Sequence, residues 1–488
     1  MTFPKQPLPI RTALRGFTLL LLTLSAPVRA TGQPVIIDAA DGNTEVEVQA
    51  ALDAHPPGTT FLMRGTFYFS GHVHIEKSGT RILGAWEDTN HDGKPDEGDA
   101  WHTTIHALPN SINLAEAFSL MPRDEVSSGG YQVKELEISG IHLAGFNRPV
   151  VVFAGPSYDQ DGCRDTPLPY ELDKVLLANN WVEGGAFWIY RRTDRVTIHN
   201  NHFTLFANQE LEAHAIEMRG LSVAGCDMEF ELDLVFQDRL TITDNVFTGA
   251  RDISVGFQRD LRIEGNVFSG NQPGDLATNR LWISQASKAL VKNNRFHGED
   301  LNGAVWFWTR SNWSGVPGIT SDEFHFIDNH FIDSPYGITI LGGTDNTAIK
   351  GNRFEQSGDF GPFSITPIRV SDIVIIGGEL MTRPSHKLEI TNNHIADAII
   401  TGVLLNGQTS GVTIENNQFD NPLAEFGDVA LADEDVLFGY GDALCPAFGN
   451  QVLASKSQPA VVINGYSERC EAGQPNTLKG NGIIDITP

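Results

Sequence analysis

The chain has 488 residues, and its 61 acidic and 34 basic side chains give a formal net charge of −27 at pH 7. General nucleic-acid binding is disfavoured, because a polyanion partner needs a basic face to displace its counterions, although one local basic cleft stays open. With 41% hydrophobic and 19% charged residues, the chain is neither disordered by composition nor embedded in a membrane.

The first thirty residues have the pattern of an export signal. Lys5, Arg11 and Arg15 precede an apolar run over residues 16–26, and Val28-Arg29-Ala30 ends the segment. The run is about half the roughly 20 residues that span a bilayer, which favours a cleavable signal over a membrane anchor. Without residues 1–30 the chain keeps 30 basic and 61 acidic side chains, a net charge of −31. We therefore expect a secreted or periplasmic protein with no membrane insertion after signal removal.

The segment that follows predicts a helix and then strands. Residues 45–54 have an amphipathic helical pattern, and residues 57–63 and 65–68 form two short strand-like runs. We expect a cap over about residues 34–58.

An acidic loop over residues 88–99 has the spacing of a calcium-binding loop. Oxygen-bearing side chains stand at loop positions 1, 3, 5, 9 and 12, the backbone carbonyl of Lys94 falls at position 7, and Gly93 supplies the tight turn at position 6. The predicted Ca²⁺ ligands are Asp88, Asn90, Asp92, Lys94, Asp96 and Asp99. Position 12 is Asp rather than Glu, and the alternative is an acidic turn without an ion. An ion in this early loop, inside an insertion over about 87–130, is expected to be structural.

The dominant feature of the chain is a repeated turn motif, in which an Asn is followed two residues later by an apolar residue, usually Phe. The Asn of each copy is Asn180, Asn201, Asn245, Asn266, Asn294, Asn329, Asn352, Asn393 and Asn417. The period is near 22 residues, with longer intervals where segments are inserted.

Each copy follows an alternating run such as residues 195–199 or 411–415, which has the period of a β-strand. Asn can adopt the left-handed conformation at a bend and can hydrogen-bond the Asn of the next coil, while the Phe turns inward. Coils stacked about 4.8 Å apart would then share one core. An antiparallel jelly roll or sandwich, the alternative, would not require stacked Asn residues.

These repeats and the capping segment resemble the right-handed parallel β-helix superfamily, the pectin-lyase-like fold, of the secreted bacterial type. The resemblance implies an all-β solenoid over residues 31–488, with an N-terminal capping helix, coils over about 59–486 and inserted loops. It also implies a polysaccharide partner bound along one outer face. We expect a monomer.

The four cysteines, Cys163, Cys226, Cys445 and Cys470, lie in insertions. In an exported protein they are interpretable as disulfides, for which three pairings exist. Cys163–Cys226 and Cys445–Cys470 close the most local loops and are favoured over a metal site.

The strands that follow the Asn corners can be aligned on Trp188, Glu217, Ser254, Trp282, Trp306 and Thr339. This alignment places aromatic and charged residues on the side opposite the core. Inward residues include Phe187, Ile189, Ile253 and Val255, and the opposite parity is expected to face solvent. The predicted substrate-binding residues on that side are Trp188, Tyr190, Arg280, Trp282, Trp306, Trp308 and Arg310. Stacked aromatic rings present apolar faces to sugars, whereas the alternative is a second small core beneath the inserted loops.

The catalytic candidates on this side are Glu217, Asp252, Arg219 and Arg192. Glu217 and Asp252 stand two positions out of register on adjacent strands, which places their Cβ atoms roughly 7–8 Å apart and admits hydrolysis with inversion. The arginines could instead neutralise a uronate for β-elimination, with Tyr190 or His202 as the base. Two solvated charges are the plain alternative for the carboxylate pair.

The sequence therefore favours a carbohydrate-active protein, either a polysaccharide lyase or a glycoside hydrolase. No Asp-Pro-His motif of alginate epimerases is present, and the paired-aspartate and Gly-His-Gly signatures of polygalacturonases are also missing. A non-catalytic surface or glycan-binding protein is the main alternative, and a structural, tailspike-like role is the third. His202, His330 and His394 are interpreted as exposed turn residues.

Overall fold

The computed structural model describes residues 33–108, 116–120, 131–153, 170–190, 193–204, 214–219, 237–248, 252–269, 278–297, 303–308, 322–333, 336–341, 343–355, 366–371, 373–376, 379–382, 385–398, 401–406, 409–410, 412–420, 429–432, 451–453, 461–462, 477–479 and 484–485. For some strand residues among these only the backbone is described. Residues 1–32, which hold the expected export signal, and all four cysteines lie outside the described residues.

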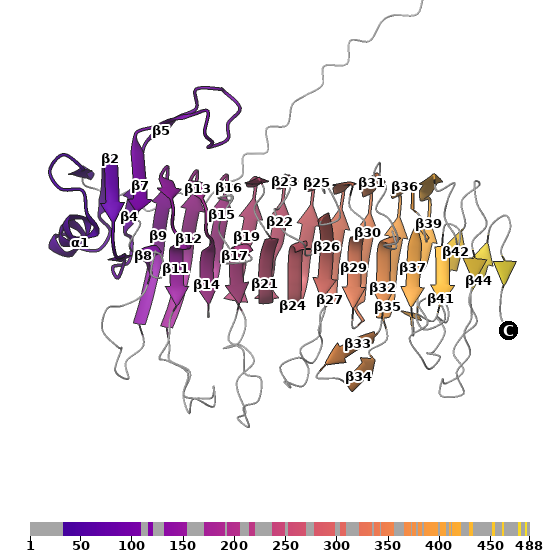
Figure 1. Ribbon diagram of the computed structural model, residues 1–488. Helices are drawn as coiled ribbons and strands as arrows, with labels where there is room; N and C mark the ends of the chain where they lie inside the picture. Colours follow the sequence, from indigo (N-terminus) through magenta and orange to yellow (C-terminus); the bar gives the residue numbers. More distant parts are fainter. Residues whose placement is uncertain are drawn as a thin grey trace, which may run out of the picture. The chain divides into compact units, whose positions relative to one another are not determined.

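Residues 34–488 form one compact unit, in which short strands from successive coils pair in parallel and give three faces (Figure 1). The first face carries the predicted outer binding surface. Its strands are β3 (Val73–His74), β8 (Glu116–Ser119), β11 (Arg148–Phe153), β14 (Phe187–Tyr190), β17 (His214–Arg219), β21 (Asp252–Arg259), the first half of β24 (Thr278–Lys292), β26 (Gly303–Trp308), β29 (Tyr336–Leu341), β32 (Thr366–Ser371), β37 (Val403–Asn406), β41 (Val429–Ala432), β43 (Val461–Val462) and β45 (Ile484–Asp485).

The second face precedes each Asn corner and the third follows it. The second face contains β1 (Val35–Asp38), the first half of β2 (Thr60–Phe69), β4 (Arg81–Leu83), β9 (Tyr131–Ser139), β12 (Tyr170–Ala178), β15 (Thr193–His199), β18 (Gln237–Asp238), β19 (Thr241–Thr243), β22 (Arg262–Glu264), the second half of β24, β27 (Asp322–Ile327), β30 (Asp345–Lys350), β35 (Ser385–Thr391), β38 (Thr409–Ser410), β39 (Thr413–Glu415), β42 (Gln451–Leu453) and β44 (Thr477–Lys479). The third face contains the second half of β2, β7 (Thr103–Ala107), β10 (His142–Ala144), β13 (Trp181–Glu183), β16 (His202–Thr204), β20 (Val246–Thr248), β23 (Val267–Ser269), β25 (Arg295–His297), β28 (His330–Ile332), β31 (Arg353–Glu355), β36 (His394–Ala396) and β40 (Gln418–Asp420). The predicted all-β parallel solenoid is confirmed, and the antiparallel alternative is excluded.

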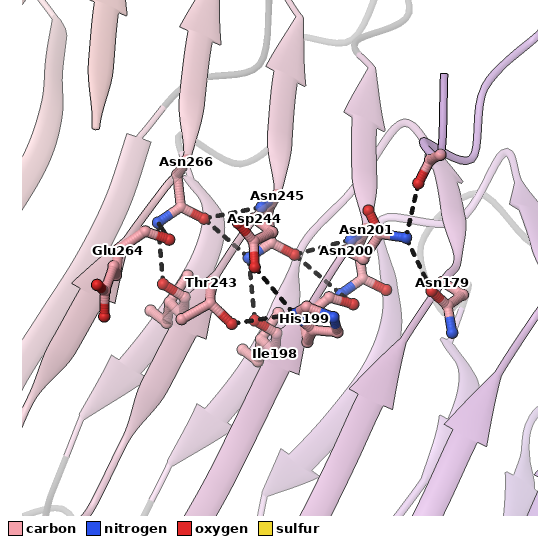
Figure 2. Close-up of polar contacts among 12 residues, drawn as sticks. Asn179, Ile198, His199, Asn200, Asn201, Thr243, Asp244, Asn245, Glu264 and Asn266 are labelled. Atoms are coloured by element: carbon pink, nitrogen blue, oxygen red, sulfur yellow. Dashed lines mark hydrogen bonds and ion pairs between the residues drawn. The ribbon is translucent and has the colours of Figure 1, made fainter. Parts of the chain in front are cut away.

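Two neighbouring residues with different roles form each Asn corner. The first has positive φ, for example 51° at Asn200 and 58° at Asp244. From Asn180 to Asn393 the second is a fully buried Asn that joins two coils, and these Asn residues form a ladder: the Nδ2 of Asn245 donates to Oδ1 of Asn266 over 3.0 Å and to the carbonyl of Ile198 over 3.0 Å (Figure 2). The Oδ1 of each ladder Asn also accepts from the backbone N–H of the previous one, as between Asn266 and Asn245 at 2.9 Å. The ladder therefore satisfies backbone groups that the bend removes from the sheets.

The apolar residue of each motif stacks in the core. The rings of Phe203, Phe247, Phe268, Phe296, Phe331 and Phe354 follow one another at centroid distances of 4.6–5.1 Å, with interplanar angles of 15° or less. All six are buried. Offset-stacked aromatic rings add to the hydrophobic stabilisation of the core.

A second corner has a different chemistry; it lies within β12 and β15 and between β18 and β19 on the second face. Here Lys174, Arg195 and Arg239 have positive φ, and their side chains form ion pairs with carboxylates of neighbouring coils. Arg195, for example, contacts Asp173 through two hydrogen bonds of 2.8 and 2.5 Å. Charged side chains thus connect coils where no Asn ladder exists.

The predicted capping helix is confirmed as α1 (Glu45–Ala54). Thr44 and Glu47 form a capping box at its start, and Val48 and Leu52 are buried against the first coil. The side-chain amide of Gln49 accepts from the backbone N–H of His74 over 2.7 Å and donates to the backbone carbonyl of His74 over 3.3 Å. The helix therefore covers the first coil and also fixes the position of β3.

Two antiparallel hairpins leave the coils. One is formed by β5 (Trp86–Glu87) and β6 (Ala100–Trp101) and carries the acidic loop, and the other by β33 (Ile373–Ile376) and β34 (Glu379–Thr382). Within the range 87–130 expected to be an insertion, β7 and β8 are coil strands that pair with their neighbours. Within the described residues, no helix is long and apolar enough to cross a membrane.

Candidate functional site

One row of residues runs along the outer side of the first face, and it is called the outer row below. Strand register places in it His74, Ser119, Val151, Trp188, Glu217, Ser254, Trp282, Trp306, Thr339, Arg369, Leu404 and Ala430. The strand alignment made from the sequence, from Trp188 to Thr339, is therefore confirmed. The inward residues Phe187, Ile189, Ile253 and Val255 are buried as expected.

The outer row brings some predicted site residues together on adjacent strands. Trp188 pairs with Glu217, and Trp282 pairs with Trp306. Asp252 pairs with His214, next to an irregularity in the β17–β21 ladder. The residue opposite Glu217 is Ser254, so Asp252 lies two residues before that position on β21.

For several predicted site residues the structure describes the backbone only, and two further ones lie outside the described residues. The backbone-only set is Tyr190, Glu217, Arg219, Asp252, Arg280, Trp306 and Trp308, and the two outside the described residues are Arg192 and Arg310. Arg280 stands at an irregularity between β24 and β26, where the register shifts between Asn279 and Leu281. Roles in catalysis or binding for these residues stay predictions.

The expectation that the outer parity faces solvent is wrong at part of the outer row. Ser119, Ser254 and Thr339 are 1–2% exposed, although they stand on the outer side. A small side chain about 4.8 Å from a tryptophan on the next strand, as Ser254 is from Trp282, is shielded by the larger ring. The hydroxyl of Thr339 is buried and has no hydrogen-bond partner in the protein. A buried polar atom of this kind requires a water or a ligand.

A cluster of titratable side chains lies at the N-terminal end of the outer row, and sequence reasoning missed it. The guanidinium carbon of Arg148 lies 3.2 Å from the ring centroid of Trp188, and Arg148 pairs in register with Glu116. Burial raises the pKa of Glu116, against the lowering effect of Arg148 and His74. The only sequence signal was the His-Val-His alternation at residues 72–74, which precedes the first recognised repeat.

Carboxylates of the acidic loop accept hydrogen bonds from the loop's own backbone amides. The N–H of Gly93 donates to Oδ2 of Asp88 over 2.9 Å, and the N–H of Lys94 donates to Oδ1 of Asp92 over 2.7 Å. The second carboxylate oxygen of Asp88 is buried without a hydrogen-bond partner. Across the described residues, however, no group of three or more His, Cys, Asp or Glu side chains already converges as a metal site. The loop thus has the donor types and the turn of a calcium site, with its carboxylates turned toward backbone amides.

The acidic loop packs on the Asn corner of coils far ahead in sequence. Asn200 donates from Nδ2 to the carbonyl of Gly93 over 3.1 Å, and Lys94 donates from Nζ to the carbonyl of Asp244 over 2.5 Å. A ring nitrogen of His202 lies 3.2 Å from the carbonyl of Pro95. The loop therefore connects the first coils to the middle ones.

An aromatic cluster on the third face anchors the hairpin that carries this loop. The ring of His142 stacks on Trp181 at 3.9 Å, and Trp101 of β6 packs against both rings. Burial lowers the pKa of His142 to about 4, and burial raises the pKa of Glu183, whose carboxylate lies 3.0 Å from the His142 ring. The rings are covered by the hairpin, so the cluster is a second small core.

We expect His142 to make the protein less stable in mild acid. Its folded pKa of about 4 lies below the usual 6.5, so the unfolded chain binds the proton first. The stabilisation is complete above pH 6.5 and decreases as the pH falls toward 4, by about 3 kcal/mol at most. The raised pKa of Glu183 acts in the opposite direction. Urea unfolding of wild type and His142→Gln across this range should show a shallower dependence in the variant, whereas an unchanged slope would contradict the assignment.

The interpretation of His202, His330 and His394 as exposed turn residues is wrong. Each begins a third-face strand, is half-buried, and contacts a side chain of the next coil. Their ring nitrogens lie 2.9 Å from Thr248 Oγ1, 2.6 Å from Glu355 and 3.0 Å from Asp420, respectively. The turn ends one residue earlier than expected, because the buried Asn already closes it.

Comparison with known proteins agrees with this architecture. A model of the right-handed β-helix region matches residues 170–354 and 309–425, which together span more than half of the chain. The chain belongs to this right-handed β-helix family. No curated protein matches the chain significantly.

Among solved structures, the chain is similar to PfbA, a surface adhesin of Streptococcus pneumoniae, at 15% identity, a TM-score of 0.50 and coverage of 82% of this chain and 93% of that chain. It is also similar to DFA-IIIase from Arthrobacter chlorophenolicus A6 in complex with GF2, at 16% identity, a TM-score of 0.45 and coverage of 79% and 91%. The third is the A-module of the mannuronan C-5 epimerase AlgE6 from Azotobacter vinelandii, at 12% identity, a TM-score of 0.44 and coverage of 93% and 97%. At 15% identity, the likeness to PfbA indicates the fold and leaves the activity to the site residues.

Proposed function

We propose that this protein is an exported, carbohydrate-active β-helix protein that binds a polysaccharide along the outer row of the first face. The observation that carries the proposal is the register of that row, which aligns Trp188, Trp282 and Trp306 along one face: Trp282 and Trp306 are on adjacent coils, and two coils lie between Trp188 and Trp282. Aromatic rings aligned along a face can stack on the apolar faces of sugars in an extended polymer. Export rests on the signal-like pattern of residues 1–30.

Polar groups beside these rings support a sugar ligand rather than an apolar one. Arg148 supplies a positive charge beside Trp188, and a guanidinium can donate to the hydroxyl or carboxylate groups of a sugar. The net charge of −27 repels an acidic polymer at long range, so such a substrate would depend on local arginines of this kind.

Cleavage of the bound polymer is the leading activity, by elimination or by hydrolysis. Hydrolysis would use Glu217 and Asp252 as an acid and a base, whereas elimination would use arginines such as Arg219 to neutralise a uronate. A non-catalytic glycan-binding or surface role is the second candidate, and the absence of complete catalytic signatures of known families in the sequence favours it.

One experiment separates these activities. The purified mature protein, with calcium, is incubated with a panel of neutral and acidic polysaccharides, and absorbance near 235 nm and reducing ends are measured in parallel. New absorbance identifies elimination, and reducing ends without it identify hydrolysis. Binding without either product supports the non-catalytic role, and neither binding nor product contradicts the proposed function.

We also propose that residues 88–99 bind a structural Ca²⁺ ion. The ligands would be Asp88, Asn90, Asp92, Asp96 and Asp99 with the Lys94 carbonyl, and the unpartnered oxygen of Asp88 supports this set. The bound ion would neutralise the carboxylates that crowd the loop; burial and the charges of Asp96 and Asp88 already raise the pKa of Asp99.

We expect calcium to stabilise the protein through this loop. Because a ligand that binds only the folded state stabilises it, saturating Ca²⁺ should raise the melting temperature by several degrees over protein in EDTA, and about 3 kcal/mol is expected at 100 times the Kd. Asp88→Ala should abolish the shift, whereas Asp41→Ala, a change outside the loop, should leave it intact. An equal shift in Asp88→Ala would show that the ion binds elsewhere.

A further inference from the structure

Two histidines at the N-terminal end of the outer row point their Nε2 atoms toward each other. Their Nε2 atoms lie 3.1 Å apart, the ring centroids lie 4.5 Å apart, and the ring planes meet at 73°. The residues are His72, immediately before β3, and His74 within it, and their rings meet on one side of the chain. Both rings are half-buried.

This spacing fits two ligands of one metal ion. Imidazole nitrogens bind Zn²⁺ at about 2.0–2.1 Å, so two of them stand roughly 2.8–3.3 Å apart for coordination angles between square-planar and tetrahedral. The observed 3.1 Å lies inside this range. A single hydrogen bond between two neutral rings has the same separation, and the experiment must distinguish it from a metal site.

The surroundings of the pair match those of metal-binding histidines. The second nitrogen of His72, Nδ1, lies 3.7 Å from Oε2 of Glu116, just beyond hydrogen-bond distance, and a carboxylate that closes such a gap behind a ligating histidine fixes its tautomer and orientation. The His74 backbone is held by Gln49, and Ser70 is held through its N–H and hydroxyl by the Glu45 carboxylate, at 3.0 and 2.7 Å. The segment is therefore fixed at both ends by α1, and the pair is preorganised.

We propose that His72 and His74 bind a divalent transition-metal cation, Cu²⁺ or Zn²⁺, through their Nε2 atoms, with Glu116 orienting His72. Two protein ligands leave the remaining coordination positions open to water or to an oxygen of a ligand. His74 begins the outer row, so the ion stands at the end of the surface proposed to bind polysaccharide. Metal binding at this site can be tested separately from polysaccharide binding, because the titration contains no sugar.

Copper binding tests the site directly. Cu²⁺ is titrated into tag-free mature protein in excess Ca²⁺, with calorimetry for affinity and electron paramagnetic resonance for the ligand set. We expect one tight site per chain with two imidazole nitrogens. His72→Gln and His74→Gln should each weaken binding at least about tenfold, and Glu116→Gln about tenfold. His325→Gln, an exposed histidine of β27, should bind as wild type.

Unchanged affinity in the double variant His72→Gln/His74→Gln would overturn the proposal, and so would a wild-type spectrum without two imidazole nitrogens. The spectrum is recorded on unaltered protein, so it decides the matter even if a variant fails to fold. A protein whose histidines only share a hydrogen bond would show neither the tight site nor this spectrum.

Discussion

Asn266→Leu is expected to lower the free energy of unfolding by about 4 kcal/mol. Asn266 is fully buried; its Nδ2 donates to the carbonyl of Ile242 and to Asn294, each over 2.9 Å, and its Oδ1 accepts from Asn245. Leucine has a similar volume but leaves the Asn245 N–H buried without its partner, at about 1–3 kcal/mol, and removes the bonds to Ile242 and Asn294, at about 1 kcal/mol each. The denaturant midpoint and the melting temperature, measured on the same preparation, report the loss.

The matched control is Asn346→Gly. Asn346 is an exposed asparagine with φ of 53° at the other corner, outside the ladder, and glycine adopts this conformation readily. We expect a change within about 0.5 kcal/mol. If Asn266→Leu were as mild as this control, the ladder would not be the element that holds adjacent coils together.

Phe268→Ala is expected to cost about 3–5 kcal/mol, because it removes a buried ring from the middle of the aromatic stack. Phe268 lies 4.6 Å from Phe247 and 4.8 Å from Phe296, centroid to centroid, and nothing else in the core can fill its place without breaking that stack. Near-ultraviolet circular dichroism, recorded during urea unfolding, measures both the packing of the aromatic rings and the free energy of unfolding.

Val267→Ala on the same strand is the control for this change. Val267 stands on the outer side of β23 and is half-buried, so its truncation should cost less than about 1 kcal/mol. If both variants lost the same free energy of unfolding, the Phe268 ring would contribute no more to stability than the two methyl groups of Val267.

The repeat predicted most of the coil, because one motif carries both the bend and the core residue. The buried Asn, the inward Phe and the strand alignment from Trp188 to Thr339 follow from spacing alone, since every coil must stack on the last. The second corner was missed because its positive-φ position has no constant residue type: it holds Asn346, but also Lys174, Arg195 and Arg239. The pairing of these three basic residues with acids of other coils becomes visible only in three dimensions.

The candidate site was less predictable, because it depends on contacts between distant segments. The sequence placed tryptophans on the outer row but could not place Arg148 over Trp188 or Glu116 beside His72, which lie 40 and 44 positions apart. It also could not foresee that Ser254 and Thr339 are buried on the outer side, since the large neighbours that shield them belong to other coils.

The central claim is that the outer row, and not another face, binds carbohydrate. The most direct measurement is affinity electrophoresis or calorimetry of wild type, Trp282→Ala and Tyr68→Ala on a polysaccharide that the wild type binds. Trp282 stands in the outer row, whereas Tyr68 is an exposed aromatic residue of the third face, 42% exposed. The account predicts at least about tenfold weaker binding for Trp282→Ala, as for a buried aromatic anchor, and no change for Tyr68→Ala. Weaker binding in Tyr68→Ala with wild-type affinity in Trp282→Ala would contradict it.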